Sequence, residues 1–376
     1  MLSCDATQGT KNATSAGPMA QPVAGHVAAA LRSITVDSFL QARREKSANE
    51  TGVVVIETTC SVGEALGRLA AAHITSAPLV SPASAGDPGY RVLAFMSVRD
   101  ILRHFSMRAR DAVPPSQHLL QRMAALSALG HSLAGEQALS LGVQDDGDML
   151  YASATRTTTM LDLVRAGLLH GPAQRPALPA RHRVGVFDSH GQVTDIISQS
   201  DVVAWLRGLG PEILGPTAGR SVQALVAGRT VVTVPATLPT DQALAVLVQH
   251  DVGAVGVVDA DSGALVGMLS ESDFRGCRPW DFGSFALPVA QWLVHAKGVS
   301  VVHDGRSRSI RDPWASALLD AHIVIALPPT ATLLEVMDTL VTRHIHRVFI
   351  LSPAGAPLAV VTHTDVLNAL FHRAQP

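Results

Sequence analysis

Four copies of one short pattern constrain this chain more than any other feature. In each copy an apolar run ends in Ser or Thr, and Asp follows three residues later. The copies read FMSVRD, IISQSD, MLSESD and VVTHTD, and they end at Asp100, Asp201, Asp273 and Asp365. A pattern that recurs along one chain indicates a reused piece of structure, and so small a piece cannot bury its apolar face alone. We therefore expect four small units that pack against one another.

Each copy also has the same order of predicted elements. A helical segment and a short apolar strand precede the pattern, as in SVGEALGRLAAA followed by APLV and in TLLEVMDTLVTRH followed by RVFIL. Ser61 with Glu64, and Thr332 with Glu335, have the spacing of capping boxes, so two of these helices should begin there. The unit reads strand, helix, strand, strand, helix, which predicts an α/β (α+β) fold.

The copies also predict the domain organisation. They lie near 52–105, 150–207, 228–276 and 322–373. The segment GLGPEILGPTAGR is rich in Gly and Pro and separates the first two copies from the last two. We expect a disordered tail over 1–33, a first pair of repeats over 34–210 and a second pair over 215–376. Within the second pair, repeats 3 and 4 should complete each other's buried faces. An insert after repeat 1 contains QHLLQRMAALSAL, which predicts a helix.

Composition excludes several classes of protein. The chain of 376 residues has a formal net charge of -2 and no run of Lys or Arg, which argues against a nucleic-acid partner. Apolar segments such as ALAVLVQHD end well before the roughly 18 residues that a membrane-spanning helix needs. Cys4, Cys60 and Cys277 are far apart and lack CxxC spacing, so we expect a reducing compartment without disulfides or a cysteine zinc site.

Repeats 2 and 4 carry a His-Arg pair that the other two repeats lack. His182-Arg183 and His346-Arg347 each lie at the start of an apolar run, and in both copies the His is 19 positions before the Asp. Repeats 1 and 3 have Thr75-Ser76 and Gly253-Ala254 at the equivalent positions. A guanidinium beside an imidazole suits a phosphate, because Arg can donate two hydrogen bonds to it with charge assistance. The pairs therefore indicate phosphate binding at every second repeat.

The unit resembles the cystathionine-β-synthase (CBS) domain. Four copies together resemble the gamma, energy-sensing subunit of AMP-activated protein kinase and its plant and fungal relatives. The resemblance covers about residues 34 to 373 and is carried by VQHDVGAVGVVD, by HRVFILSPAGAPLAVVTHTDVL and by the alternating His-Arg pairs. It implies four CBS repeats arranged as two tandem pairs, or Bateman modules, that form a pseudo-symmetric disc.

The resemblance also implies nucleotide sites between the repeats. The Asp at each helix start would accept hydrogen bonds from the ribose hydroxyls: Asp100, Asp201, Asp273 and Asp365. The His-Arg pairs would face the phosphates at the centre of the disc: His182, Arg183, His346 and Arg347. Hydroxyl groups nearby would add contacts: Ser198, Ser270, Thr362 and Thr364. The ligand would be AMP, ADP or ATP, and the resemblance implies no catalytic residue, metal or other cofactor.

The chain departs from the animal subunit at the phosphate positions. Thr75 and Asp251 stand where that subunit carries an additional Arg, and Ser200 stands where it carries a Lys. Repeat 2 keeps Asp201, where the animal protein loses its ribose carboxylate. These differences predict a less basic centre.

Structural roles explain the same residues. Ser or Thr followed three residues later by Asp is also a normal helix start. The histidines would then lie at the edge of the core and the arginines would pair with nearby acids. His344, His346 and His363 have no carboxylate or cysteine spaced to complete a metal site.

Three functions compete on this sequence. The leading expectation is a non-catalytic regulatory subunit that binds adenine nucleotides and modulates a protein kinase, with a catalytic chain and a scaffold (beta-type) chain as partners. The second is a stand-alone CBS-domain protein that regulates another enzyme, with weak or lost nucleotide binding. An enzyme is the third, and the repeats with their inserts leave no room for a catalytic domain. We expect a cytoplasmic location, with the nucleus and the plastid as alternatives.

Overall fold

The computed structural model describes most of the chain. The described residues are 24–46, 52–82, 89–114, 116–141, 152–169, 181–299, 314–315, 318 and 324–371. Cys4 and most of the predicted disordered tail lie outside them. No helix among these residues combines the length and the apolar composition needed to span a membrane.

Four three-stranded sheets form the framework, one in each predicted repeat. In every sheet the first strand pairs in parallel with the second, and the second pairs antiparallel with the third. The strands are β1 (Ile56–Glu57), β2 (Ser76–Pro82) and β3 (Tyr90–Ser97); β4 (Ala152–Ala154), β5 (Arg183–Phe187) and β6 (Val193–Ser198); β7 (Thr233–Pro235), β8 (Ala254–Val258) and β9 (Leu265–Ser270); and β10 (Ala326–Leu327), β11 (Arg347–Leu351) and β12 (Pro357–Thr362). The common strand order confirms the α/β unit that the sequence predicts.

Irregularities of the backbone repeat as well. The antiparallel register shifts once within the middle strand of each sheet, between Leu79 and Val80, Val186 and Phe187, Val257 and Val258, and Ile350 and Leu351. In repeats 1, 3 and 4 one residue with positive φ follows the first helix: His73 (φ 54), Asp251 (φ 49) and His344 (φ 51). His and Asp are among the non-Gly residues that adopt this conformation most readily. The units therefore agree in detail as well as in strand order.

Two helical segments complete each unit. One connects the two parallel strands, and the other follows the third strand. They are α3 (Val62–Ala71) and α4 (Val98–Ala112); α6 (Met160–Asp162), which continues as a π-helix, η2 (Leu163–Leu169), and α7 (Gln199–Gly208); α10 (Thr240–Gln249) and η4 (Glu271–Phe274); and α13 (Leu333–Thr342) and α14 (His363–Phe371). Both predicted capping boxes are confirmed, with Ser61 and Thr332 at the N-caps of α3 and α13.

Further helices lie outside the four units. They are α1 (Ala24–Arg32), α2 (Val36–Lys46), α5 (Leu119–Ala134), η1 (Ala138–Leu141), α8 (Pro211–Leu214), η3 (Gly215–Gly219), α9 (Val222–Leu225), η5 (Pro279–Ala286) and α11 (Val289–Ala296). The helix predicted in the first insert is confirmed as α5, which packs along η5 of the second insert.

The disordered tail predicted over 1–33 is wrong in its last part. Val27 and Leu31 of α1 are four residues apart and bury their side chains, so they share one apolar helix face.

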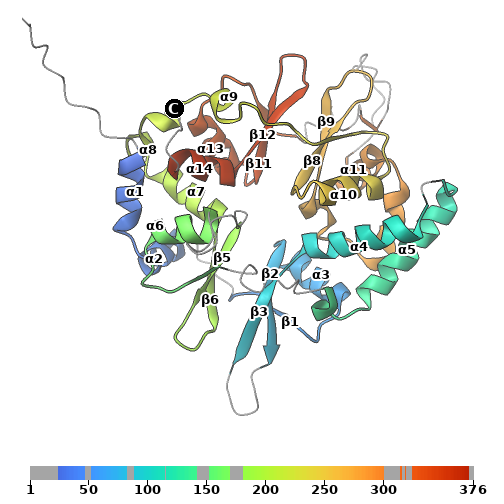
Figure 1. The fold of residues 1–376 in the computed structure, drawn as a ribbon, viewed down its shortest axis with the longest axis horizontal. Coiled ribbons are helices and arrows are strands. Elements are labelled where there is room, and N and C mark those ends of the chain that lie inside the picture. Colours follow the sequence, from blue (N-terminus) through green and yellow to red (C-terminus); the bar gives the residue numbers. More distant parts are fainter. Residues whose placement is uncertain are drawn as a thin grey trace, which may run out of the picture.

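The four units are arranged in a ring (Figure 1). Within the first pair the sheets meet through Val80 and Val92 of repeat 1 and Val193 of repeat 2. In the second pair the amide of Leu265 in β9 donates to the carbonyl of Gly355, 3.0 Å away, beside β12. The tandem pairs of the predicted disc are therefore present, with sheet contacts inside each pair.

The helices, in contrast, pack between the pairs. One apolar cluster joins α3 and α4 of repeat 1 to α10 of repeat 3 and takes in α5, η5 and α11. We call it the repeat 1–3 core. The other joins α7 of repeat 2 to α13 and α14 of repeat 4 and takes in α1 and α2, and we call it the repeat 2–4 core. The expectation that repeats 3 and 4 complete each other's buried faces is therefore wrong for the helical faces, because these faces meet partners from the first pair.

Candidate functional site

All four carboxylates of the repeated pattern begin helices. In repeat 1 the Asp100 Oδ2 accepts hydrogen bonds from the amide and the hydroxyl of Ser97, at 2.8 and 2.7 Å, while Ser97 Oγ accepts from the Asp100 amide at 3.2 Å. The same box forms with Ser198, Ser270 and Thr362 in the other repeats. The capping role is therefore confirmed in every copy, and it occupies Oδ2 of each Asp. A ligand would be left with Oδ1.

The surroundings of the carboxylates differ between repeats. Asp273 Oδ1 is 2.5 Å from Lys297 Nζ, and Asp365 Oδ1 accepts from Arg229 Nη1. In repeat 2 Arg43 Nη1 approaches Asp201, but at 3.8 Å from Oδ2, so Oδ1 receives no hydrogen bond from a described residue. The four copies are thus equal as helix caps and unequal as acceptors for a ligand.

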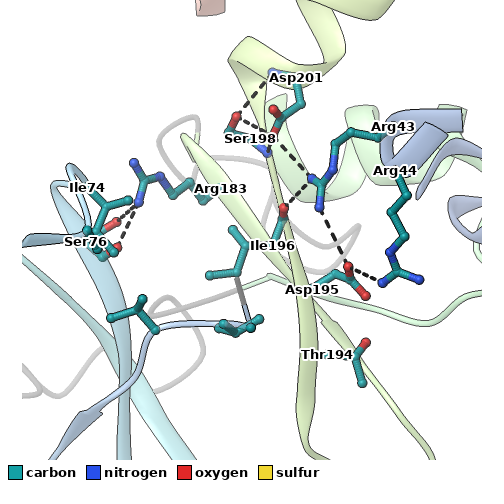
Figure 2. A pocket seen from close by; sticks show the side chains of 14 residues that line it. Arg43, Arg44, Ile74, Ser76, Arg183, Thr194, Asp195, Ile196, Ser198 and Asp201 are labelled. Carbon is teal, nitrogen blue, oxygen red and sulfur yellow. Dashed lines mark hydrogen bonds and ion pairs between the residues drawn. The ribbon is translucent and has the colours of Figure 1, made fainter. Parts of the chain in front are cut away.

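A cavity of about 520 Å³ lies between repeats 1 and 2. Ser198, Asp201 and Arg183 of repeat 2 line it together with Ile74 and Ser76 of repeat 1 (Figure 2). The Arg183 Nη1 donates across the cavity to the carbonyl and the hydroxyl of Ser76, at 2.8 and 3.1 Å. The structure thus brings together one predicted ribose acceptor, its hydroxyl neighbour and one predicted phosphate-binding Arg.

Helix α2 forms the opposite wall of this cavity. Arg43 donates to the carbonyl of Ile196 at 2.9 Å, and Arg44 donates to Asp195 Oδ1, also at 2.9 Å (Figure 2). Asp195 is buried in β6 and also accepts from Arg156 Nη2 at 3.1 Å. Buried carboxylates are retained when they are paired, so these arginines tie α2 to repeat 2. The sequence patterns did not identify Arg43 and Arg44, because α2 lies outside the repeated unit.

The remaining His-Arg pair lies at the centre of the ring. Arg347 opens β11 and approaches Gly253 of repeat 3, where an added Cβ would be 3.0 Å from its Nη2. The same Cβ would be 3.2 Å from Nη2 of Arg99 in α4. Gly253, which stands where repeat 4 has His346, therefore leaves room for two guanidinium groups from two other repeats.

Arg99 is a basic residue at the centre that the sequence patterns did not identify. Its Nε donates to Glu271 at 2.5 Å, and its Nη1 donates to Asp251 at 3.2 Å; Arg103 donates to Asp251 at 3.0 Å. Arg99 is thus an additional cation here, paired with carboxylates of repeat 3. Aligning the four Ser/Thr-x-x-Asp copies would have singled it out, because the residue before Asp is Ser or Thr in the other three.

Three histidines complete the centre: His363 is buried, whereas His182 and His346 are exposed at its edge. Partial desolvation lowers the pKa of His182 and His346, and nearby arginines lower both further. The pKa of His363 falls to about 3, mainly through burial and then through His346 and His182. The rings of His346 and His363 are 5.7 Å apart, edge to face. These lowered pKa values favour the uncharged imidazole, which can donate one hydrogen bond.

The predicted supporting hydroxyls are already engaged within the protein. Ser198, Ser270 and Thr362 donate to the capping carboxylates. Thr364 donates to Gln199 Oε1 at 2.8 Å, which links repeat 4 to repeat 2. Among the described residues no group of three or more His, Cys, Asp or Glu side chains has the arrangement of a metal site.

Two of the repeats match a known protein family. The family model described as the CBS domain matches residues 224–277 and 320–372. These two segments are CBS domains. They overlap the predicted repeats 3 and 4, and the sheets of repeats 1 and 2 have the same strand order as theirs. A comparison of the sequence with curated proteins gave no match.

Comparison with solved structures gives one match that shares this fold and others that are weaker. A protein from Methanocaldococcus jannaschii, described as a proposed archaeal homologue of the AMPK γ subunit, has a TM-score of 0.56 at 13% identity over 85% of this chain and 96% of that chain. An uncharacterised conserved protein from Pyrococcus horikoshii covers the same shares at 17% identity, with a TM-score of 0.42. The CBS domain of a bacterial CNNM/CorC-family Mg²⁺ transporter in complex with ATP matches 45% of this chain and 96% of its own at 14% identity, with a TM-score of 0.29.

Proposed function

We propose that this chain is a non-catalytic regulatory protein that binds adenine nucleotides between its repeats. The cavity between repeats 1 and 2 carries this proposal, because Asp201 and Arg183 line it together. Its volume of about 520 Å³ is within the range of roughly 300–1,000 Å³ that is usual for small-molecule sites. In this cavity Oδ1 of Asp201 accepts from the ribose hydroxyls, and Arg183 turns from Ser76 to the phosphate.

The regulated partner in this proposal is a protein kinase. The proposal draws on the sequence resemblance to the gamma subunit of AMP-activated protein kinase, and the tandem CBS fold is consistent with it. The chain would then assemble with a catalytic chain and a scaffold chain and would work in the cytoplasm or the nucleus. In this proposal Asp100 offers a further ribose acceptor, and His182, His346 and Arg347 serve the phosphates at the centre. Asp273 and Asp365 would accept a ribose only where their basic partners are displaced.

Calorimetry on matched variants tests the nucleotide site. AMP, ADP, ATP and S-adenosylmethionine are titrated into the wild type, Asp201→Ala and Asp162→Ala. Asp162 is a suitable control because Thr159 Oγ1 donates to it at 2.7 Å in the cap of α6, away from the cavity. We expect Asp201→Ala to weaken nucleotide binding about tenfold to a hundredfold, since hydrogen bonds to a charged group contribute roughly 1.5–3 kcal/mol.

Asp162→Ala should lose only the contribution of a cap to stability, about 0.5–2 kcal/mol. Equal nucleotide affinity in both variants would mean that Asp201 acts only as a helix cap.

Co-purification from native cells tests whether the partner is a protein kinase or another enzyme. A catalytic kinase chain is expected, and recovery of unrelated enzymes alone would favour a stand-alone CBS-domain protein.

A further inference from the structure

We infer that two basic side chains, Lys297 and Arg229, take the place of the ribose hydroxyls in repeats 3 and 4, so that nucleotide enters at Asp201 in preference to Asp273 and Asp365. This inference rests on the proposed nucleotide binding and adds which acceptors are used. It follows from contacts that the protein itself makes with the second oxygen of each carboxylate.

In repeat 3 both carboxylate oxygens of Asp273 already have donors. Oδ2 accepts from the amide and the hydroxyl of Ser270 at 2.7 and 2.9 Å, and Oδ1 is 2.5 Å from Lys297 Nζ. The Asp273 side chain is 9% exposed. Lys297 is the C-cap residue of α11, and a cation is favoured at that end of a helix. The ammonium group therefore reaches Asp273 from a position that is favourable in its own right.

Repeat 4 repeats this arrangement with a different cation. Oδ2 of Asp365 accepts from the amide and the hydroxyl of Thr362, both at 2.7 Å, and Oδ1 accepts from Arg229. The Asp365 side chain is 15% exposed. Arg229 lies in a turn that follows α9, where its amide donates to the carbonyl of Val226 at 3.1 Å. Two unrelated segments, one before β7 and one after α11, thus supply a cation to equivalent carboxylates.

In repeat 2 no described residue occupies Oδ1 of the carboxylate in this way. Oδ2 of Asp201 accepts from Ser198 at 2.8 and 2.6 Å, and the guanidinium of Arg43 is 3.8 Å from the same oxygen. Oδ1 receives no hydrogen bond from a described residue, and the side chain is 35% exposed beside the cavity. A ribose hydroxyl can therefore approach Oδ1 without displacing a donor.

The chemistry of exchange favours this division. A ribose hydroxyl is a neutral donor, whereas ammonium and guanidinium donate charge-assisted hydrogen bonds, which are roughly twice as strong. Displacing the cation would also leave a mostly buried carboxylate without its charge partner. A neutral diol does not compensate for that loss, so Asp273 and Asp365 remain paired when nucleotide is added.

Adenosine is the appropriate probe, because it presents the ribose without a phosphate. Binding of adenosine and AMP is measured by calorimetry on the full chain and on Asp201→Ala, Asp273→Ala and Asp365→Ala. We expect Asp201→Ala to weaken binding at least tenfold, and each of the other two to change it less than twofold. Melting temperatures of all variants show that the comparison is made on folded protein.

The decisive variants remove the cations in the Asp201→Ala background. Lys297→Met and Arg229→Met each free one carboxylate, so each should restore adenosine binding at least tenfold relative to Asp201→Ala alone. Arg110→Met is the matched control, because Arg110 is 74% exposed and pairs with the neighbouring Asp111. It should restore nothing.

The outcomes separate this inference from the proposed function. Weaker AMP binding in Lys297→Met or Arg229→Met, with Asp201 intact, would overturn the inference, because the cations would then be contacting the phosphate. So would a loss in Asp365→Ala as large as that in Asp201→Ala. If only the cation-free variants bind, the blocking of Asp273 and Asp365 by the two cations stands, but entry at Asp201 and nucleotide binding by the wild type are refuted. If no protein binds either probe, both are refuted.

Discussion

The two apolar cores differ in what they are built from. The repeat 1–3 core contains an assembly of rings in edge or stacked contact: Phe105, Phe274, Phe282, Phe285 and Trp292. It also contains a buried ion pair between Arg122 of α5 and Asp241 of α10. The repeat 2–4 core consists mainly of Val, Leu, Met and Ala side chains, and α1 and α2 cover it.

Each core nevertheless takes one repeat from each half of the chain. The halves therefore cannot be regarded as two independent domains joined by a linker. Each tandem pair has sheet contacts of its own, but its helical faces are completed by the other pair. The comparison shows that segments outside the repeats, α5 with η5 on one side and α1 with α2 on the other, give two similar cores different chemistry.

Separating the halves should have the largest effect. We expect isolated residues 215–376 to show no cooperative thermal transition, because Leu244 and Leu340 would lose the helical partners that repeats 1 and 2 provide. Mixing this fragment with residues 1–210 should restore a transition. Circular dichroism melts measure the thermal transition, and size-exclusion chromatography measures whether the fragments associate. A cooperative, monomeric melt of the second half alone would mean that the sheet contacts suffice.

The buried ion pair should be the next most sensitive feature, and only in the repeat 1–3 core. Arg122→Met leaves the buried Asp241 carboxylate without its charge partner, so we expect a loss of about 3–5 kcal/mol in the free energy of unfolding. Replacing both residues, as Arg122→Met with Asp241→Leu, should recover most of it. Arg207 and Asp338 pair between α7 and α13 on a half-exposed surface of the other core. There Arg207→Met should cost only about 0–1 kcal/mol.

Chemical denaturation gives these free energies directly. Equal losses in the two single Arg variants would show that the buried pair is no more important than the surface pair.

Acidification should affect the repeat 2–4 side more than the other. The folded-state pKa of His363 is lowered to about 3, below its unfolded value of 6.5, so the unfolded chain binds the additional proton. Stability should therefore fall as the pH drops below about 6.5, by up to roughly 1.4 kcal/mol per pH unit for this group. Glu271, on the repeat 1–3 side, gives stability the opposite pH dependence. Burial raises its pKa, so its contribution to the free energy of unfolding is lost as the pH rises.

His363→Gln should flatten the decline of the melting temperature between pH 6.5 and pH 5. His131→Gln is a control, since this exposed histidine lies on α5 with its Nδ1 2.8 Å from the carbonyl of Ser127. A decline that is identical in wild type and His363→Gln would show that His363 takes no part in it.

The smallest expected difference concerns the helix caps, which the two cores share. Ser61 and Thr332 cap α3 and α13 through the same box, each accepting from an amide at 3.2 Å. Ser61→Ala and Thr332→Ala should each cost about 0.5–2 kcal/mol and should agree closely. Denaturant melts of both variants test this. A much larger loss at one site would show that one core depends on its local cap more than the other.

Local features of the fold could be predicted from the sequence because they depend on neighbouring residues. The strand order, the capping boxes and helix α5 follow from periodicity and from contacts three or four residues apart. The partners of Asp273 and Asp365 could not be predicted in this way. Arg229 is 136 residues away from Asp365, and no pattern within one repeat indicates which cation approaches its carboxylate.

Two errors have physical causes that can be identified. The sequence predicts a disordered tail because residues 1–30 are rich in small residues, but Val27 and Leu31 suffice to bury one face of a short helix. From the sequence we expect the helices of repeats 3 and 4 to pack against each other because these repeats are adjacent in the chain. In the structure adjacent repeats meet through their sheets instead. The helices therefore face the next pair, and sequence proximity is a poor guide to which repeats share a core.

The packing of α1 against α14 gives the ring a property beyond its stability. The first and the last described helices are neighbours in space, on the same side of the ring (Figure 1). The order of the repeats along the chain is thus one of several that would place the same repeats in contact. A rearranged chain that starts at repeat 3 in the segment around 210–219, and that joins α14 to α1 through a short linker, would meet the same partners in a different order. In this fold, connectivity and architecture can be varied separately.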